Sequence, residues 1–96
     1  MGRIRLTQTR VDDFRCDEGA SQSFLWDSEA PGLAVRATPT GRKTYIFQAK
    51  LRAGQTVRVA VGDVKAWRLE SVGTEKPGAR AKARELQTLV DSGLDP

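Results

Sequence analysis

The sequence lacks histidine altogether and contains a single cysteine, Cys16. One thiol cannot form an internal disulfide, and without histidine there is no credible set of zinc ligands. A serine or cysteine nucleophile would have no imidazole to activate it, and no glycine-rich phosphate-binding loop is present. A chain of 96 residues also buries too small a core for a deep catalytic cleft. The sequence therefore predicts a non-enzymatic domain with no cofactor, no metal and no small-molecule substrate.

Long hydrophobic runs are missing as well. No run approaches the ~20 apolar residues that span a bilayer, and residues 1–9 lack the apolar core of a secretory signal. The composition, with 39% hydrophobic and 29% charged residues, is typical of one small folded domain. We therefore expect a cytoplasmic protein that has no membrane partner.

Acidic residues are nearly absent from the middle of the chain. Residues 32–68 contain eight Lys and Arg with Asp63 as their single acid, a net charge of +7 in a chain whose total is +4. Residues 1–31 carry a net −2 and residues 69–96 a net −1. This clustering is typical of a domain that binds a polyanion, although a solvated face that keeps the protein soluble would have the same charge.

The basic segment also shows the pattern of an antiparallel β-sheet. Apolar and polar residues alternate through residues 33–38, 44–52 and 57–61, and the links "TPTGRK" and "RAGQ" carry residues typical of tight turns. "FLWD" can add a short edge strand, and Thr7 is a candidate cap for a short helix in an N-terminal arm of residues 1–23. An inward row is apolar and consists of Leu33, Val35, Ala37, Tyr45, Phe47, Ala49, Leu51, Val57, Val59 and Val61.

A C-terminal helix is predicted to cover this apolar row. Its apolar stripe consists of Ala79, Ala83, Leu86, Leu89 and Val90, with Gly93 as a suitable end. The expected fold is therefore α+β, with a three-stranded antiparallel sheet, a further short strand at its N-terminal side, and one helix packed on the sheet.

The opposite row of side chains is basic and forms the candidate binding face. Tyr45 lies in the apolar row, and Trp26 and Trp67 are interpreted as core or rim packing, so no aromatic ring is expected on the basic face and stacking of unpaired bases is disfavoured. A twisted sheet with small and hydrogen-bonding side chains can enter a major groove about 12 Å wide. The predicted DNA contacts are Arg36, Thr38, Arg42, Lys43, Thr44, Gln48, Lys50, Arg52 and Arg58.

These contacts divide by position. Arg36, Gln48 and Arg58 lie near the middle of their strands and are expected to meet base edges, whereas residues at the strand ends are expected to hold phosphates. Arg42, Lys43 and Arg52 form that second group. A domain that binds double-stranded RNA, or a protein-interaction module whose basic face meets an acidic partner, remains an alternative at this point.

A set of spaced features extends from about Phe24 to Pro96. These features are Trp26-Asp27, Pro31-Gly32-Leu33, Gly41 with Lys43, Gly62, Ala79-Arg80 and the terminal Gly93-Leu94-Asp95-Pro96. Together they resemble the N-terminal arm-type DNA-binding domain of integrases from temperate phages, prophages and genomic islands, which are tyrosine recombinases.

The resemblance implies a function for the whole basic face. Residues 24–96 would be an arm-type domain whose sheet is laid into the major groove of double-stranded DNA at arm-type attachment sites. The chain would be a fragment of a longer integrase active in DNA integration and recombination, with the catalytic arginines, histidine and tyrosine elsewhere. Other integrase protomers would be partners, and the bacterial nucleoid would be the location. The spacing between Trp67 and Arg80 is longer than the family pattern, so the start of the helix is not fixed.

Overall fold

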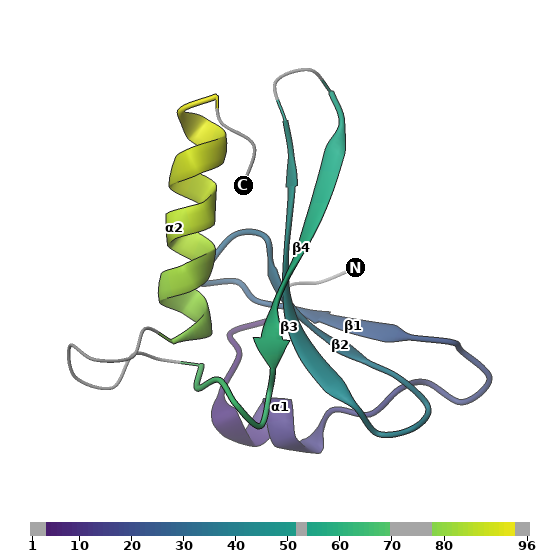
Figure 1. Cartoon of the computed structure of the whole chain (residues 1–96). Helices are drawn as coiled ribbons and strands as arrows, with labels where there is room; N and C mark the ends of the chain where they lie inside the picture. Colours follow the sequence, from purple (N-terminus) through teal and green to yellow (C-terminus); the bar gives the residue numbers. More distant parts are fainter. Residues whose placement is uncertain (1–3, 52–53, 70–77, 94–96) are drawn as a thin grey trace.

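A four-stranded antiparallel sheet and two helices make up the computed structural model, which describes residues 4–51, 54–69 and 78–93 (Figure 1). The elements in chain order are α1 (Gln8–Asp13), β1 (Ser23–Trp26), β2 (Leu33–Ala37), β3 (Lys43–Lys50), β4 (Thr56–Asp63) and α2 (Ala79–Asp91). Strand order in the sheet follows chain order, β1-β2-β3-β4. The α+β class is confirmed. The expected count of three main strands is corrected to four, because the short segment before the basic region pairs fully with β2 as β1.

Two tight turns hold β2, β3 and β4 in consecutive order. Gly41, with φ +87°, lies within a turn closed by a hydrogen bond from the Thr38 N–H to the Arg42 carbonyl at 3.0 Å. Gly54 has φ +92° between β3 and β4. A side chain is strained in this left-handed region, so glycine is needed at both turns, as the sequence predicts.

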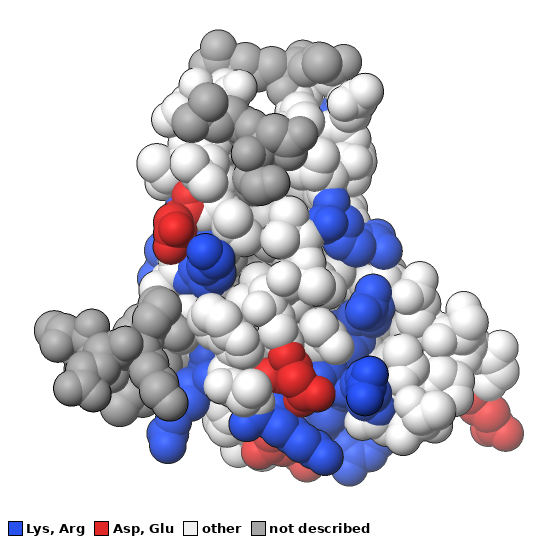
Figure 2. Space-filling view, in the orientation of Figure 1, with Lys and Arg blue, Asp and Glu red and all other residues white. Residues whose placement is uncertain are grey.

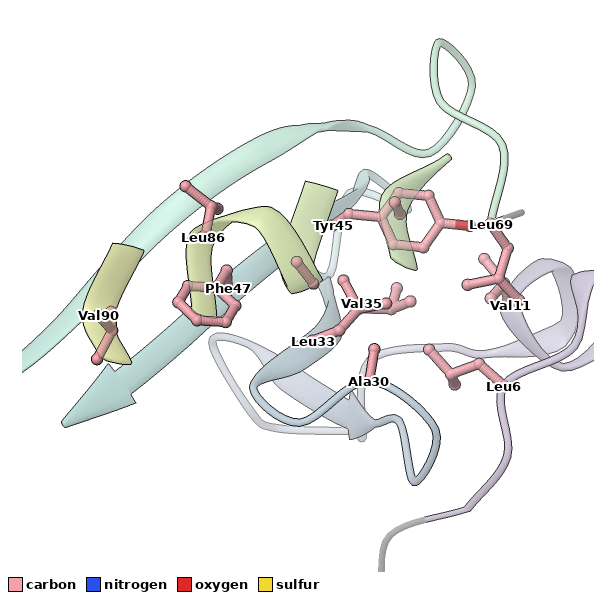
Figure 3. Packing of buried hydrophobic residues seen from close by; sticks show 12 residues of the cluster. Leu6, Val11, Ala30, Leu33, Val35, Tyr45, Phe47, Leu69, Leu86 and Val90 are labelled. Carbon is pink, nitrogen blue, oxygen red and sulfur yellow. The ribbon is translucent and has the colours of Figure 1, made fainter. Parts of the chain in front are cut away.

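The main core lies between one face of the sheet and α2. Leu33 and Val35 from β2 and Tyr45 and Phe47 from β3 are fully buried (Figure 3). The α2 side chains in this cluster are those of Ala79, Ala83, Leu86 and Val90, as the helical stripe predicts. The Tyr45 ring is a fully buried structural element of this core, and its burial raises the pKa of the hydroxyl to about 12.

The N-terminal segment packs into the same cluster. The Thr7 side chain caps α1 by accepting a hydrogen bond from the Arg10 N–H at 3.1 Å, which confirms the predicted cap. Leu6 and Val11 are fully buried in the core cluster that also holds residues of the sheet and α2. The division of the chain at residues 23 and 24 stays a prediction.

A buried ion pair connects the start of α2 to the turn between β1 and β2. The Arg80 Nε donates to Asp27 Oδ2 at 2.8 Å, and the Arg80 Nη2 donates to the Leu6 carbonyl at 2.7 Å. Asp27 also accepts from the Leu6 N–H at 3.1 Å and from the Ala30 N–H at 3.2 Å. These bonds join three segments that are distant in sequence.

The limits of α2 are set by glycines on both sides. Gly78 is the N-cap of the helix, so the helix starts directly after Pro77-Gly78. Gly93, with φ +83°, donates its N–H to the Val90 carbonyl at 3.0 Å and ends it as predicted. The spacing that left the helix start open, residues 70–77, lies outside the described residues.

Within the described part of the chain, no helix is long and apolar enough to cross a membrane. The same residues contain no group of three or more Cys, Asp or Glu side chains that could hold a metal ion.

Candidate nucleic-acid interface

The strand register assigns the predicted contact residues to a face. Side chains that are paired across neighbouring antiparallel strands lie on the same side of the sheet. The pairs Arg36↔Thr44 and Gln48↔Arg58 therefore place these four residues together. Lys50 is on the same face by alternation along β3. This face, the one turned away from α2, is called the outward face below. The predicted grouping of Arg36, Thr44, Gln48, Lys50 and Arg58 is thus confirmed as a shared face.

Two aromatic rings lie on the outward face, which corrects the expectation that it has none. Phe24 pairs with Arg36 and Trp26 pairs with Ala34, so both β1 rings are on this side. Their centroids are 5.9 Å apart with an interplanar angle of 24°. The Arg58 guanidinium lies over the Phe24 ring, with its Cζ 4.9 Å from the centroid. This distance is in the range of a cation–π contact.

The contact between Phe24 and Arg58 also shows that the sheet is strongly curled. β1 and β4 are at opposite edges, which in a flat sheet would be about 14 Å apart. Figure 1 shows β1 and β2 running across the direction of the hairpin formed by β4 and the later part of β3, so β3 changes direction along its length. Ala34 and Ile46, between the two edges on this face, are buried at 0% and 1% exposure. The centre of the outward face is therefore covered apolar surface and is not a bare basic plane.

Gln48 and Arg58 are bonded to each other. The Gln48 Oε1 accepts from the Arg58 Nε at 3.0 Å and from the Arg58 Nη2 at 2.7 Å. The two side chains predicted to meet base edges independently are thus one hydrogen-bonded unit.

Thr38 and Arg42 lie apart from this unit, in the turn between β2 and β3. The Thr38 Oγ1 lies 2.9 Å from the Thr40 Oγ1, and the Arg42 side chain is exposed. Arg42 is therefore free to reach a phosphate at this end of the sheet, as expected for an anchoring residue. Arg52, expected at the opposite end of β3, lies outside the described residues.

Lys43 is on the other side of the sheet, which corrects its expected place beside Arg42. It pairs with Ala37 on the face that carries Tyr45. Its Nζ donates to the Val11 and Asp12 carbonyls, each at 2.8 Å. These carbonyls belong to the C-terminal end of α1, where a cation is favourable because helix carbonyls are unpaired there. Lys43 therefore attaches α1 to the sheet.

Positive charge is gathered on one part of the visible surface. Figure 2 shows Lys and Arg side chains in a column beside the centre of the molecule, with few acidic groups among them. Cations therefore predominate over acidic groups on this part of the surface.

The chain belongs to the arm DNA-binding domain family. The family model matches residues 6–96. Over all 96 residues, the chain is 41% identical to the prophage integrase IntF of Escherichia coli (strain K12). The match covers 100% of this chain and 19% of that protein, so the chain spans about a fifth of the length of its relative.

Sequence reasoning missed the parts of the site that depend on β1. The alternation of Phe24, Leu25 and Trp26 carries a signal, because once Leu25 is assigned to the core the two rings must point to the opposite face. For Lys43 the signal was its position two residues before the buried Tyr45, on the same side of β3.

The ion pair between Asp27 and Arg80 connects two motifs that carried the family resemblance.

Proposed function

We propose that this domain binds double-stranded DNA at arm-type attachment sites through the outward face of its sheet, which enters the major groove. The observation that carries the proposal is the separation of the two faces in a member of the arm DNA-binding domain family. One face is closed by α2, and the other presents the side chains of Arg36, Gln48, Lys50 and Arg58.

The proposed contacts follow from the geometry of this face. Arg36, Thr44, Gln48, Lys50 and Arg58 are proposed to contact the groove, and Thr38 and Arg42, in the turn between β2 and β3, its phosphate walls. Arg52, which lies outside the described residues, stays a predicted phosphate contact. Lys43 is left out of the set, because its ammonium group is bonded to α1 on the opposite side of the sheet.

The wider role is proposed by analogy with the E. coli relative. Residues 24–96 would supply DNA recognition to an integrase that acts in site-specific integration and recombination, and the strand-exchange chemistry would lie outside these residues. Its partners would be arm-type attachment sites and neighbouring integrase protomers. Its place would be on nucleoid DNA in the bacterial cytoplasm.

A competition experiment with matched variants tests the proposal. A fluorescent DNA duplex bound to the chain is challenged with unlabelled DNA or RNA duplex of the same sequence, and anisotropy is measured. We expect DNA to compete better, because the deep and narrow major groove of RNA does not admit a sheet. The Arg36→Gln, Lys50→Gln double variant should bind the DNA about ten-fold or more weakly, since two phosphate or base contacts are removed.

The control changes the same amount of charge on the helix side. Lys82→Gln with Arg84→Gln alters two side chains of α2, away from the outward face, and should leave DNA affinity nearly unchanged. Equal losses in the two double variants, or equal competition by RNA, would contradict the proposal. Absence of binding to either duplex at low salt would favour a protein-interaction module instead.

A further inference from the structure

The side chain of Arg58 is held in place from two directions. Its guanidinium lies over the Phe24 ring, with Cζ 4.9 Å from the centroid. Two of its N–H groups, on Nε and Nη2, donate to the single oxygen Gln48 Oε1 at 3.0 and 2.7 Å. An exposed arginine ordinarily samples many rotamers, and fixing it on binding costs entropy. Here Phe24 and Gln48 fix the plane and direction of the guanidinium before any ligand arrives.

Among the described residues, Gln48 alone accepts hydrogen bonds from the Arg58 guanidinium, and one end of the guanidinium is left free. A guanidinium has five N–H donors, of which the side edge formed by Nε and Nη2 is bonded to Gln48. The free end formed by Nη1 and Nη2 carries parallel donors and no acceptor. Such a fork matches the O6 and N7 acceptors of guanine in the major groove.

Gln48 is correspondingly less suited to a base contact of its own. A glutamine that recognises adenine needs its amide oxygen to accept from the adenine N6 amino group. In this structure that oxygen already accepts two hydrogen bonds from Arg58. The pair as a whole therefore offers donors, and its complement is a base edge rich in acceptors.

We infer that Phe24 is a positioning residue for DNA recognition: its ring, together with the Gln48 amide oxygen, aims the free end of the Arg58 guanidinium at a guanine. Phe24 acts through Arg58 and contacts no base itself. The inference rests on the proposed function, and it adds the identity of a recognised base and a residue from β1 that controls the recognition.

The first test concerns the free protein. The Arg58 Nε–H signal in the ¹H–¹⁵N NMR spectrum should be shifted by the ring current of Phe24. Phe24→Leu should abolish that shift, whereas Phe24→Tyr, which keeps an aromatic face, should preserve it. The Arg84 Nε–H signal, from α2, serves as the internal control and should not change in either variant. An Arg58 signal that is the same in all three proteins would overturn the inference.

The second test measures base preference. The chain is used to select duplexes from a pool with a randomised central segment, and the position at which Arg58→Ala loses its preference is identified. We expect guanine at this position. Affinity is then measured for the selected duplex and for a copy with that G·C pair replaced by A·T. Phe24→Leu should weaken binding to the G·C duplex about two- to five-fold, the equivalent of a cation–π contact, and leave binding to the A·T copy unchanged. Phe24→Tyr should restore the preference.

The outcomes separate the inference from the proposed function. If the wild-type chain enriches no sequence and binds no duplex, the proposed function is wrong and the inference fails with it. If it enriches a site but Phe24→Leu weakens both duplexes equally or neither, Phe24 has only a structural role and the inference alone is wrong. Should Phe24→Leu not fold, Gln48→Ala removes the other restraint on Arg58 and should show the same selective loss at the G·C duplex.

Discussion

At the scale of single residues, Asp27 joins distant parts of the chain. Its carboxylate is 1% exposed and accepts from Arg80 and from the Leu6 and Ala30 N–H groups. Asp27→Asn would break the buried ion pair with Arg80, and breaking a buried pair by removing one charge costs about 3 to 5 kcal/mol. We expect a loss of this order in the free energy of unfolding at pH 7, measured by chemical denaturation. Asp13→Asn, on an exposed carboxylate of α1, is the control and should change little.

The same pair gives the stability a defined pH dependence. Burial alone would raise the pKa of Asp27, but the hydrogen bonds from Arg80, Leu6 and Glu29 and the charge of Arg80 outweigh it, so the pKa lies below its ordinary 3.8. A carboxyl group whose pKa is depressed by folding stabilises the protein above its unfolded pKa, and this contribution disappears as the pH falls through the folded pKa. The difference in unfolding free energy between wild type and Asp27→Asn should therefore shrink below about pH 4. A difference that is constant down to pH 3 would show that the charge of Asp27 is not what stabilises the fold.

At the scale of elements, the attachment of α1 depends on Lys43. Lys43→Met keeps the apolar stem of the side chain but removes the ammonium group that donates to Val11 and Asp12. A cation at a helix C-terminus contributes about 0.3 to 1 kcal/mol, so we expect a loss of about this size and faster hydrogen exchange at the Val11 and Phe14 amides of α1. Hydrogen exchange followed by NMR measures this directly.

Lys50→Met is the matched variant, because Lys50 is exposed on the outward face. It should leave exchange in α1 unchanged and reduce the salt dependence of DNA binding by about one unit of slope, whereas Lys43→Met should leave that slope unchanged. A reduced slope for Lys43→Met would show instead that Lys43 contacts a phosphate, as its position in the sequence suggests.

Most of the sheet and α2 could be predicted from the sequence, because each has an unbroken period. Tyr45 and Phe47 alternate with polar neighbours on β3, and Leu86 and Val90 share one stripe of α2, so local spacing determines which side is buried. β1 is only four residues long and follows a polar loop, so the sequence does not determine its pairing. An edge strand this short is decided by tertiary contacts and not by its own propensity.

The side-chain contacts on the outward face cannot be predicted from sequence periodicity. Alternation assigns Arg58 and Gln48 to that face, but the curl that brings Arg58 to Phe24 is a property of the assembled sheet. Likewise Ala34 and Ile46 have the outward orientation that alternation gives them, yet both are buried. Sequence periodicity gives the direction of a side chain and not the neighbours that it meets.

At the scale of the whole molecule, both faces of the sheet are partly closed, but in different ways. The inner face is sealed by α2 and by the N-terminal segment around Leu6 and Val11. The outward face has a covered apolar centre around Ile46 and cations at its margins, including Lys50 and the turn residue Arg42. A covered centre with charged margins suits a surface whose central side chains contact a few base edges while its marginal cations contact the phosphates.

This arrangement predicts how binding depends on salt. If Arg42, Lys50 and Arg52 each neutralise a phosphate while Arg36 and Arg58 contact bases, about three counterions are released, and log K should fall against log salt with a slope of about −2 to −3. Base contacts release no counterions. The lines for a selected duplex and for a scrambled one should therefore be parallel, separated by about 1 to 3 kcal/mol for the Arg58 contact. Titrations by anisotropy over a salt series measure both lines.

A flat line would contradict electrostatic binding by this face. Lines that diverge would show that Arg58 holds a phosphate in one of the complexes, and the division between a reading centre and anchoring margins would then be wrong.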